Sequence, residues 1–281
     1  YSRHHFRSAK PASGGVNAKF YDFYNLTGLP FEERLAPDKL LADERFARGA
    51  ERLDYFAHAG LAALVTGPTG VGKSSLLRLF LSRLPANRYQ TLLVQQTAME
   101  ASSLLRLLVR TWNEKPGFGR DRLFDQILQK AKAAERTTLL IIDEAHLLCE
   151  SALTDLRLLL CADLDETLQM RLLLCGQDRL LQTLSRQTLA DLLNRVTIRV
   201  HLAPLTKDQT VCYLDHRLKI VGGSDKLFAA EAKARLHDFA GGIPRLLNNL
   251  ATLCLIQGAA KKQHLITTAL VDEAARELRM V

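Results

Sequence analysis

The residues of this chain that are best placed to do chemistry lie in one glycine-rich loop. Between positions 67 and 74 the sequence reads Gly-Pro-Thr-Gly-Val-Gly-Lys-Ser, which fits the spacing G-x-x-x-x-G-K-[ST] at every fixed position. Glycines let a backbone approach phosphate, because no Cβ stands in the way. At this spacing the ammonium of Lys73 reaches the β- and γ-phosphates as a catalytic group, and the hydroxyl of Ser74 ligates Mg²⁺. The loop therefore predicts a site for a nucleoside triphosphate with Mg²⁺. The predicted nucleotide contacts are Gly67, Pro68, Thr69, Gly70, Val71, Gly72, Lys73, Ser74 and Ser75.

The sequence on both sides of the loop predicts the elements that must position it. The apolar run 61–66 is typical of a buried strand, and the run 75–81 predicts a helix. A strand, a glycine-rich loop and a helix together present backbone N–H groups and a helix N-terminus to phosphate. A chance match in a glycine-containing turn is the alternative, but it would not explain why both flanks are right.

A second candidate pair, Asp143 and Glu144, follows the apolar run 138–142. A carboxylate at the end of a buried strand near the loop is where Mg²⁺ needs an oxygen ligand, so we assign Asp143 to the metal. The second carboxylate can polarise the attacking water, so we assign Glu144 as the catalytic base. The letters Asp-Glu-Ala-His also occur in a class of helicases, but the other helicase segments are not evident. We interpret His146 as a residue that starts a helix.

Three further polar residues could complete the site. Gln177 follows the predicted strand 170–175, and its amide could hydrogen-bond the γ-phosphate or the attacking water; otherwise it is a polar loop residue. Arg195 precedes the predicted strand 196–200, where it either stabilises transition-state charge in a neighbouring subunit or forms a surface ion pair. Arg245 follows Gly-Gly-Ile-Pro and lies in the first turn of a helix, where simple solvation is the alternative.

Strands and helices alternate as far as about residue 203, and only helices are predicted beyond it. The predicted strands are 61–66, 89–94, 138–142, 170–175 and 196–200, and the predicted helices are 43–59, 75–81, 101–112, 121–134, 152–162, 206–220, 227–239, 244–258 and 267–279. This order predicts an α/β fold, a P-loop parallel sheet sandwiched by helices, followed by a small all-helical lid domain. We expect a basic flexible arm at 1–19, an α/β nucleotide-binding domain at 20–203 and the helical domain at 204–281.

The composition is that of an ordinary globular protein. The chain has 281 residues, of which 47% are hydrophobic and 24% are charged. No apolar run approaches the roughly 18–20 residues of a membrane span, and no secretory signal is visible, so we expect no membrane association and a cytoplasmic location. The five cysteines show no C-x-x-C spacing and predict buried free thiols in a reducing compartment.

The net charge of +8 is compatible with nucleic acid or an anionic membrane surface as a partner. Half of the excess lies in the first twenty residues, which either bind phosphates or are merely solvated. Within residues 102–136, eight lysines and arginines face four acids. We expect some of these cations to line a side that faces DNA, although a solvated helix face is an equal alternative. The candidate DNA contacts are Arg106, Arg110, Lys115 and Arg120.

In this order the motifs resemble those of AAA+ ATPases. The opening Phe-Tyr-Asn-Leu-Thr-Gly-Leu-Pro-Phe and the later Gly-Gly-Ile-Pro-Arg-Leu-Leu-Asn-Asn-Leu are similar to the ExeA/GspA-type branch, over roughly residues 20–280. The resemblance implies that Gln177 is the first sensor, Arg195 the arginine finger and Arg245 the second sensor, all three catalytic. It also implies that Leu29, Pro30 and Phe31 flank the adenine. The first sensor departs from the commoner asparagine, which leaves its catalytic weight open.

The ExeA/GspA-type branch contains two kinds of protein. Transposon-encoded TnsC/TniB-type regulators assemble on double-stranded DNA as homo-oligomeric rings or helical filaments, and recruit transposase and target-selection proteins. Secretion ATPases act on a protein machine and add a membrane span and a cell-wall-binding part after the ATPase. The basic excess and the compact length favour the first kind, with hydrolysis driving disassembly. The second kind, with no role for DNA, is the alternative.

Overall fold

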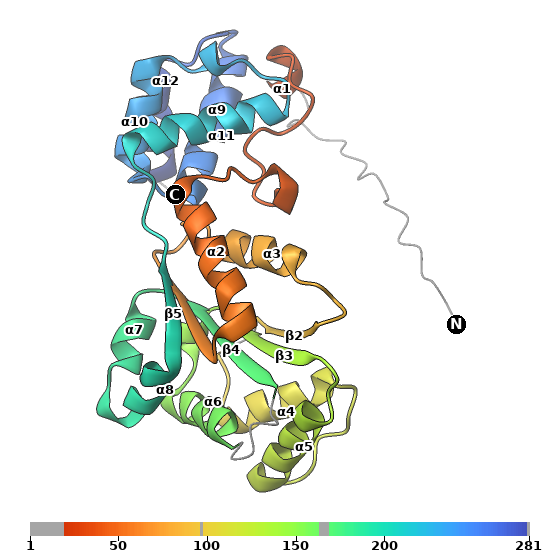
Figure 1. Cartoon of the computed structure of the whole chain (residues 1–281). Helices are drawn as coiled ribbons and strands as arrows, with labels where there is room; N and C mark the ends of the chain where they lie inside the picture. Colours follow the sequence, from red (N-terminus) through yellow and green to blue (C-terminus); the bar gives the residue numbers. More distant parts are fainter. Residues whose placement is uncertain (1–19, 96–97, 163–168, 280–281) are drawn as a thin grey trace. The chain divides into compact units, whose positions relative to one another are not determined.

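The computed structural model describes residues 20–95, 98–162 and 169–279 (Figure 1). The chain divides into two compact units. The α/β unit comprises residues 35–204. The helical unit combines the chain from Leu205 onward with the segment that ends at Arg34. The predicted flexible arm at 1–19 lies outside the described residues.

The α/β unit is built on a sheet of five parallel strands, as the alternating pattern predicted (Figure 1). Their spatial order is β2-β3-β4-β1-β5. Because all five run in parallel, the residues that follow β1, β3 and β4 emerge at the same edge of the sheet, and these are the segments expected to form the site. The strands are β1 (Ala62–Thr66), β2 (Tyr89–Val94), β3 (Thr137–Ile142), β4 (Met170–Gly176) and β5 (Val196–His201).

Two apolar clusters cover the two faces of this sheet. Alternate strand residues face opposite sides, as the period of two in a strand requires. On β1, Ala63 and Val65 pack with α2 (Glu44–Ala59) and α3 (Lys73–Arg83), whereas Ala62 and Leu64 pack with the helices on the other face. The helices on that second face are α4 (Ala101–Thr111), α5 (Arg120–Lys132), α6 (Glu150–Cys161), α7 (Arg179–Leu184) and α8 (Ala190–Arg195). Both faces are therefore buried, which explains why the strands read as continuous apolar runs.

The helical unit contains the four helices expected after residue 204. They are α9 (Lys207–Ile220), α10 (Ala230–Ala240), α11 (Pro244–Ala260) and α12 (Thr268–Arg279), and they enclose a core of their own (Figure 1). A capping box starts α9, since the Thr206 side chain accepts from the Gln209 backbone while the Gln209 side chain accepts from Thr206 N–H. Pro244 takes the first position of α11, where its missing N–H costs nothing.

The segment 20–34 packs with the helical unit, whereas the sequence placed it with the α/β domain. It begins with the short helix α1 (Phe20–Phe23). The buried guanidinium of Arg217 donates to the carbonyl oxygens of Pro30, at 2.8 Å, and Glu32. Phe31 packs edge-on against Phe228 in the helical core, with ring centroids 6.1 Å apart. An arginine far along the sequence thus fixes this segment, and no local pattern could reveal that pairing.

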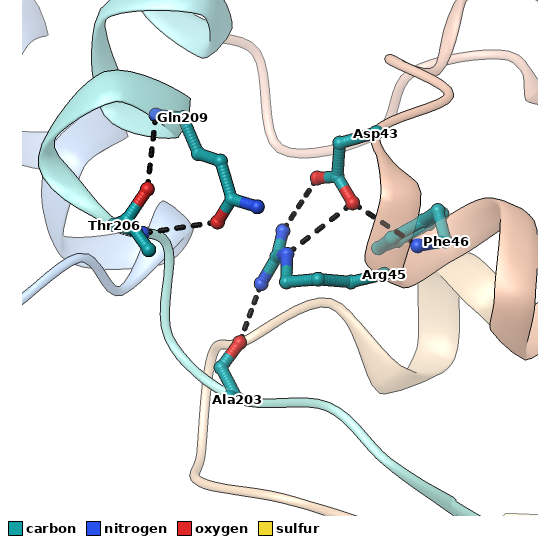
Figure 2. Close-up of polar contacts among 6 residues, drawn as sticks. All are labelled: Asp43, Arg45, Phe46, Ala203, Thr206 and Gln209. Atoms are coloured by element: carbon teal, nitrogen blue, oxygen red, sulfur yellow. Dashed lines mark hydrogen bonds and ion pairs between the residues drawn. The ribbon is translucent and has the colours of Figure 1, made fainter.

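Polar contacts anchor the chain on either side of Pro204, the last residue of the α/β unit (Figure 2). In the α/β unit Arg45 donates to the Ala203 carbonyl and forms an ion pair with Asp43, at 2.6 Å. The Asp43 carboxylate also caps α2 by accepting from Phe46 N–H. In the helical unit the capping box of Thr206 holds the start of α9 (Figure 2). These contacts lie within a few residues of the crossing at Pro204 and Leu205, one of the two places where the chain passes between the units.

All five cysteines are free, as expected, but the expectation that they are buried is wrong for three of them. Cys175 and Cys254 are buried, whereas Cys161 is partly exposed and Cys149 and Cys212 are exposed. In the part of the chain that the structure describes, no helix has the length and apolar character needed to cross a bilayer.

Candidate active site

The glycine-rich loop connects β1 to α3, as the sequence predicted. Gly67, Gly70 and Gly72 all have positive φ, at 148°, 79° and 112°. A Cβ on Gly67 would lie 2.4 Å from the Leu202 carbonyl oxygen, so the loop requires glycine there for space as well as conformation. Helix α3 begins at Lys73, so its free N–H groups and the positive end of its dipole are directed at the loop. This arrangement can bind a phosphate chain.

Lys73 is buried, with 5% of its surface exposed. Its Nζ donates to the carbonyl oxygens of Gly67 and Pro68, each at 2.9 Å. The loop therefore holds the Lys73 ammonium over its own backbone. The side chain would lose little conformational entropy when it binds an anion there. A compact positive charge at this place can offset the charge of the β- and γ-phosphates.

The two predicted metal ligands, Ser74 and Asp143, lie together. The Ser74 Oγ donates to Asp143 Oδ2 over 3.0 Å, although the two residues are 69 positions apart. A hydroxyl and a carboxylate are the oxygen donors that Mg²⁺ prefers, and Mg²⁺ usually takes one or two protein ligands and completes its shell with phosphate oxygens and water. The donor set fits that mode. Among the described residues no group of three or more metal-binding side chains gathers, so the phosphates would supply the remaining ligands.

Asp143 is oriented by its neighbours on β3 and β4. Its Oδ1 accepts from the Glu144 backbone N–H at 3.0 Å, and its side chain is almost fully buried. The thiol of Cys175 lies beside it. Burial first, and then the charge of Asp143, raise the pKa of this thiol well above its ordinary value. Burial thus favours the protonated thiol at this position.

Glu144 has an unusual backbone, with φ 54° and ψ 33° in the left-handed region. A non-glycine residue there costs free energy, and such residues gather at functional sites. Its side chain is 44% exposed, unlike the buried Asp143. The turn thus separates the two carboxylates: one faces Ser74, and the other reaches solvent, where an attacking water would be.

The sequence suggested that His146 starts a helix, and the structure also places its side chain in the site. It lies in the short 3-10 helix Ala145–Leu147, and only 2% of its side chain is exposed. Its Nδ1 is 3.3 Å from Glu144 Oε2 and also 3.3 Å from the backbone nitrogen of Gln177. Burial lowers the pKa of His146, and the positive charges of Arg179 and Lys73 lower it further against the opposing effect of Glu144. The only sequence signal for this role is its place two residues after Glu144.

Gln177 follows β4 at the same edge of the sheet as the glycine-rich loop. Gly176 pairs in register with Thr66, the residue before the loop, so β4 and β1 deliver their next residues side by side. His201 Nδ1 lies 3.3 Å from Asp178 Oδ1 across this edge, and His201 also contacts the Thr66 hydroxyl. The structure therefore brings the loop, the carboxylate pair and Gln177 together, as predicted.

Arg195 lies at the other end of the sheet. It ends α8 just before Val196, which pairs with Ala62 at the start of β1, while His201 pairs with Thr66 at the end of β1. Five steps along a strand cover about 16 Å, so Arg195 lies at the edge away from the loop of its own subunit. Its Nη1 donates to the Asp191 carbonyl within α8, at 3.1 Å. It can meet a nucleotide only if another molecule supplies one.

The remaining predicted nucleotide contacts lie in the helical unit. Arg245, in the first turn of α11, forms an ion pair with Glu33 at 3.2 Å, and both side chains are more than half exposed. Leu29 is exposed, whereas Pro30 and Phe31 are buried. A nucleotide role for these residues remains a proposal.

The candidate DNA contacts differ in their contacts within the protein. Arg106 and Arg110 are exposed on α4, and Lys115 is exposed in the turn that follows. Arg120 instead pairs with Asp155 of α6 at 2.5 Å, and the side chain of that carboxylate is only 3% exposed. Arg120 therefore joins α5 to α6.

The α4–α5 turn, residues 112–119, is held by side-chain hydrogen bonds. It also carries an exposed aromatic ring that the sequence analysis did not identify as a candidate. The Gln126 amide accepts from Gly117 N–H, at 2.8 Å, and donates to the Lys115 carbonyl, at 3.1 Å. Phe118 is 95% exposed at the tip of the turn. In the sequence, the glycines on both sides of Phe118 are the feature that could have indicated an exposed ring in a turn.

Comparisons with known proteins agree with this geometry. Residues 57–184 match the family described as AAA domain. The chain is 30% identical over 265 residues to General secretion pathway protein A of Aeromonas hydrophila; the match covers 92% of this chain but 48% of that protein, so the chain spans about half the length of this relative.

Solved structures share the fold. Drosophila ORC bound to DNA has a TM-score of 0.72 at 16% identity, and the match covers 99% of this chain and 70% of that chain. The ORC2 protein of Aeropyrum pernix in ADPNP–ADP complexes has a TM-score of 0.65 at 17% identity, with 88% and 70% covered. The glycine-rich loop and Asp143 both lie within the residues that match the AAA domain. Residues 57–184 therefore carry a domain of the AAA family, and its site has the groups that fit ATP and Mg²⁺.

Proposed function

We propose that this ATPase is a regulator that oligomerises on duplex DNA, as a ring or a helical filament, with ATP held between subunits. Hydrolysis then loosens the interface and releases the assembly. In finer terms we propose a role in DNA transposition, in which the assembly recruits transposase and target-selection proteins. The basic excess of the chain, with a net charge of +8, supports this finer role.

The position of Arg195 carries the proposal that ATP lies between subunits. The loop and Glu144 form one half of a site at one edge of the sheet, and Arg195 lies at the other edge. A head-to-tail contact between two copies would place the Arg195 edge of one against the loop edge of the next. Such heterologous contacts generate rings or open helical filaments. An arginine supplied in trans can stabilise the charge of phosphoryl transfer.

Two observations support DNA as the surface on which the assembly forms. The exposed cations Arg106, Arg110 and Lys115 lie on α4 and the α4–α5 turn, and exposed lysines and arginines are the groups that neutralise DNA phosphates. The similar fold of Drosophila ORC occurs in a structure bound to DNA. Fold likeness at this identity carries no function by itself, so the cations are the stronger support.

Electron microscopy of the purified protein with a non-hydrolysable ATP analogue tests the proposal directly. Samples with and without duplex DNA should differ: we expect rings or filaments with analogue and DNA together, and their loss when ATP replaces the analogue and is consumed. A Lys73→Ala variant, which lacks the phosphate contact, is the control and should form none. Assembly that is indifferent to DNA would contradict the DNA role and leave the ATPase assignment intact.

The similarity to General secretion pathway protein A supports a second candidate, an ATPase that assembles a protein machine without DNA. The two candidates differ in what stimulates hydrolysis. A regulator on DNA should hydrolyse ATP faster when duplex DNA is added, with a strong dependence on salt. A secretion-type ATPase should be indifferent to DNA at every salt concentration.

A further inference from the structure

One atom, Nδ1 of His146, lies 3.3 Å from two groups that belong to different parts of the site. The first is Oε2 of Glu144, the proposed base, and the second is the backbone N–H of Gln177 at the end of β4. The first contact joins His146 to the end of β3, and the second joins it to the neighbouring strand. The ring therefore bridges the two strand ends that carry the proposed base and the proposed sensor.

The chemistry of imidazole makes these two contacts exclusive while the ring is neutral. A neutral ring bears one proton, so Nδ1 either carries it and donates to the Glu144 carboxylate, or lacks it and accepts from Gln177 N–H. Burial and the nearby positive charges of Arg179 and Lys73 lower the pKa of His146, which favours the neutral ring. Glu144 and Gln177 thus compete for a single atom.

The surroundings hold the ring in this place. Only 2% of the His146 side chain is exposed. A Cβ on Gly176 would lie 3.1 Å from the backbone nitrogen of His146 and 3.2 Å from its Nδ1, so the absence of a side chain at Gly176 allows the ring to lie against β4. Glu144 itself has left-handed backbone angles, and its Oε2 lies 3.3 Å from the ring although its side chain is 44% exposed.

We propose that His146 is a positioning residue for hydrolysis: its Nδ1–H fixes one carboxylate oxygen of Glu144, and this contact forms when the Gln177 backbone releases Nδ1. The proposal rests on the assignment of Glu144 as the base. With Oε2 held by His146, the carboxylate is oriented to take the proton of the attacking water, in the way that a third group orients a base in other active sites. A movement of the end of β4 would then change the position of the Glu144 carboxylate through the His146 ring.

Substitutions at His146 test this with kcat and KM measured separately. His146→Ala should lower kcat about tenfold or more, because the base loses its orientation, while KM and the affinity for a fluorescent ATP analogue change less than about twofold. His146→Asn, whose amide can place a donor near the position of Nδ1, should restore most of the rate. His146→Gln, whose amide reaches further, should not.

His237→Ala is the matched control. His237 is also hydrogen-bonded through its Nδ1, to Thr210 at 2.8 Å, but it lies on α10 in the helical unit. Its substitution should leave kcat and KM unchanged. If His146→Ala fails to fold, the comparison of Asn with Gln still decides. An unchanged kcat in His146→Ala, or an Asn variant as slow as the Gln variant, would overturn the proposal. So would a loss of analogue affinity in proportion to kcat, because that loss marks a structural role.

Two further variants separate this proposal from the assignment of Glu144. Gly176→Ala should press on the ring and slow hydrolysis as His146→Ala does, with no further loss when the two are combined, because both act through one contact. If Gly176→Ala slows hydrolysis by the His146→Ala variant as much as it slows hydrolysis by the wild type, the bridge through His146 is contradicted. If Glu144→Gln leaves hydrolysis intact, the base assignment fails; if it stops hydrolysis while His146→Ala does not slow it, only the positioning role fails.

Discussion

Glu144 and Asp143 are adjacent carboxylates with opposite environments. Asp143 is buried beside Ser74, whereas the Glu144 side chain is 44% exposed because its left-handed backbone turns it away. Binding of the metal and activation of water can therefore be changed separately. This separation makes a conservative substitution of Glu144 informative.

Glu144→Gln should keep ATP binding and lose hydrolysis, by about a hundredfold or more, because an amide cannot accept the proton of water. Steady-state phosphate release and binding of a fluorescent ATP analogue would measure the two effects. Glu150→Gln is the matched control: Glu150 is an exposed carboxylate that pairs with Arg186 at 3.1 Å, outside the site. Phosphate release at the wild-type rate from Glu144→Gln would exclude it as the base.

In the α4–α5 region, the contacts of each cation within the protein determine whether it is available to bind DNA. Arg106 and Lys115 are exposed, whereas Arg120 satisfies the buried Asp155 carboxylate. Removing both exposed cations in Arg106→Ala, Lys115→Ala should weaken DNA binding for all sequences and flatten its dependence on salt, since each phosphate contact adds about one unit to the salt slope. Fluorescence anisotropy across salt concentrations would measure both.

Arg120→Ala is the contrasting variant. It should lower stability by about 1–2 kcal/mol, because Asp155 loses a charge-assisted hydrogen bond, and it should leave the salt slope unchanged. A flattened slope in Arg120→Ala, or an unchanged slope in the double variant, would reverse the assignment of these cations.

The turn between α10 and α11 makes a second prediction at the scale of elements. Gly241 and Gly242 both have positive φ, at 57° and 70°. A Cβ on Gly241 meets nothing within 4 Å, whereas one on Gly242 would lie 2.1 Å from the Leu205 carbonyl oxygen. Gly241→Ala should therefore cost about 1 kcal/mol for its backbone alone, and Gly242→Ala about 3 kcal/mol or more. Thermal unfolding by circular dichroism would compare them, and equal losses would contradict the close approach to Leu205.

Sequence patterns predicted the elements where periodicity was strong and missed what depends on contacts across the chain. The strands were predictable because both faces of a parallel sheet are buried, and the loop because its glycines and Lys73 are fixed by spacing. Helices α7 and α8 were missed because each has only six residues, too few for a periodic pattern. The packing of residues 20–34 with the helical unit depends on Arg217, and the role of His146 depends on the end of β4.

At the scale of the whole molecule, the two halves of the proposed composite site lie at opposite edges of one sheet. No motion within the sheet can bring Arg195 to the loop of the same subunit, because β5 is hydrogen-bonded to β1 along its length. If Arg195 belongs to the proposed site, it must therefore act on the nucleotide of a second copy. This requirement can be tested without any structure of the assembly.

Two inactive variants should restore each other's activity when mixed. Arg195→Ala has an intact loop but no finger, and Glu144→Gln has no base but an intact Arg195. In randomly mixed assemblies about a quarter of the interfaces would join an intact loop half to an intact finger, so phosphate release should rise towards a quarter of the wild-type rate. Mixing Glu144→Gln with Lys73→Ala should restore nothing, because both defects lie in the same half. Arg186→Ala is a surface control and should be fully active. If that control is active and the first mixture stays as inactive as its components, Arg195 does not act on a neighbouring subunit. The composite site would then be excluded.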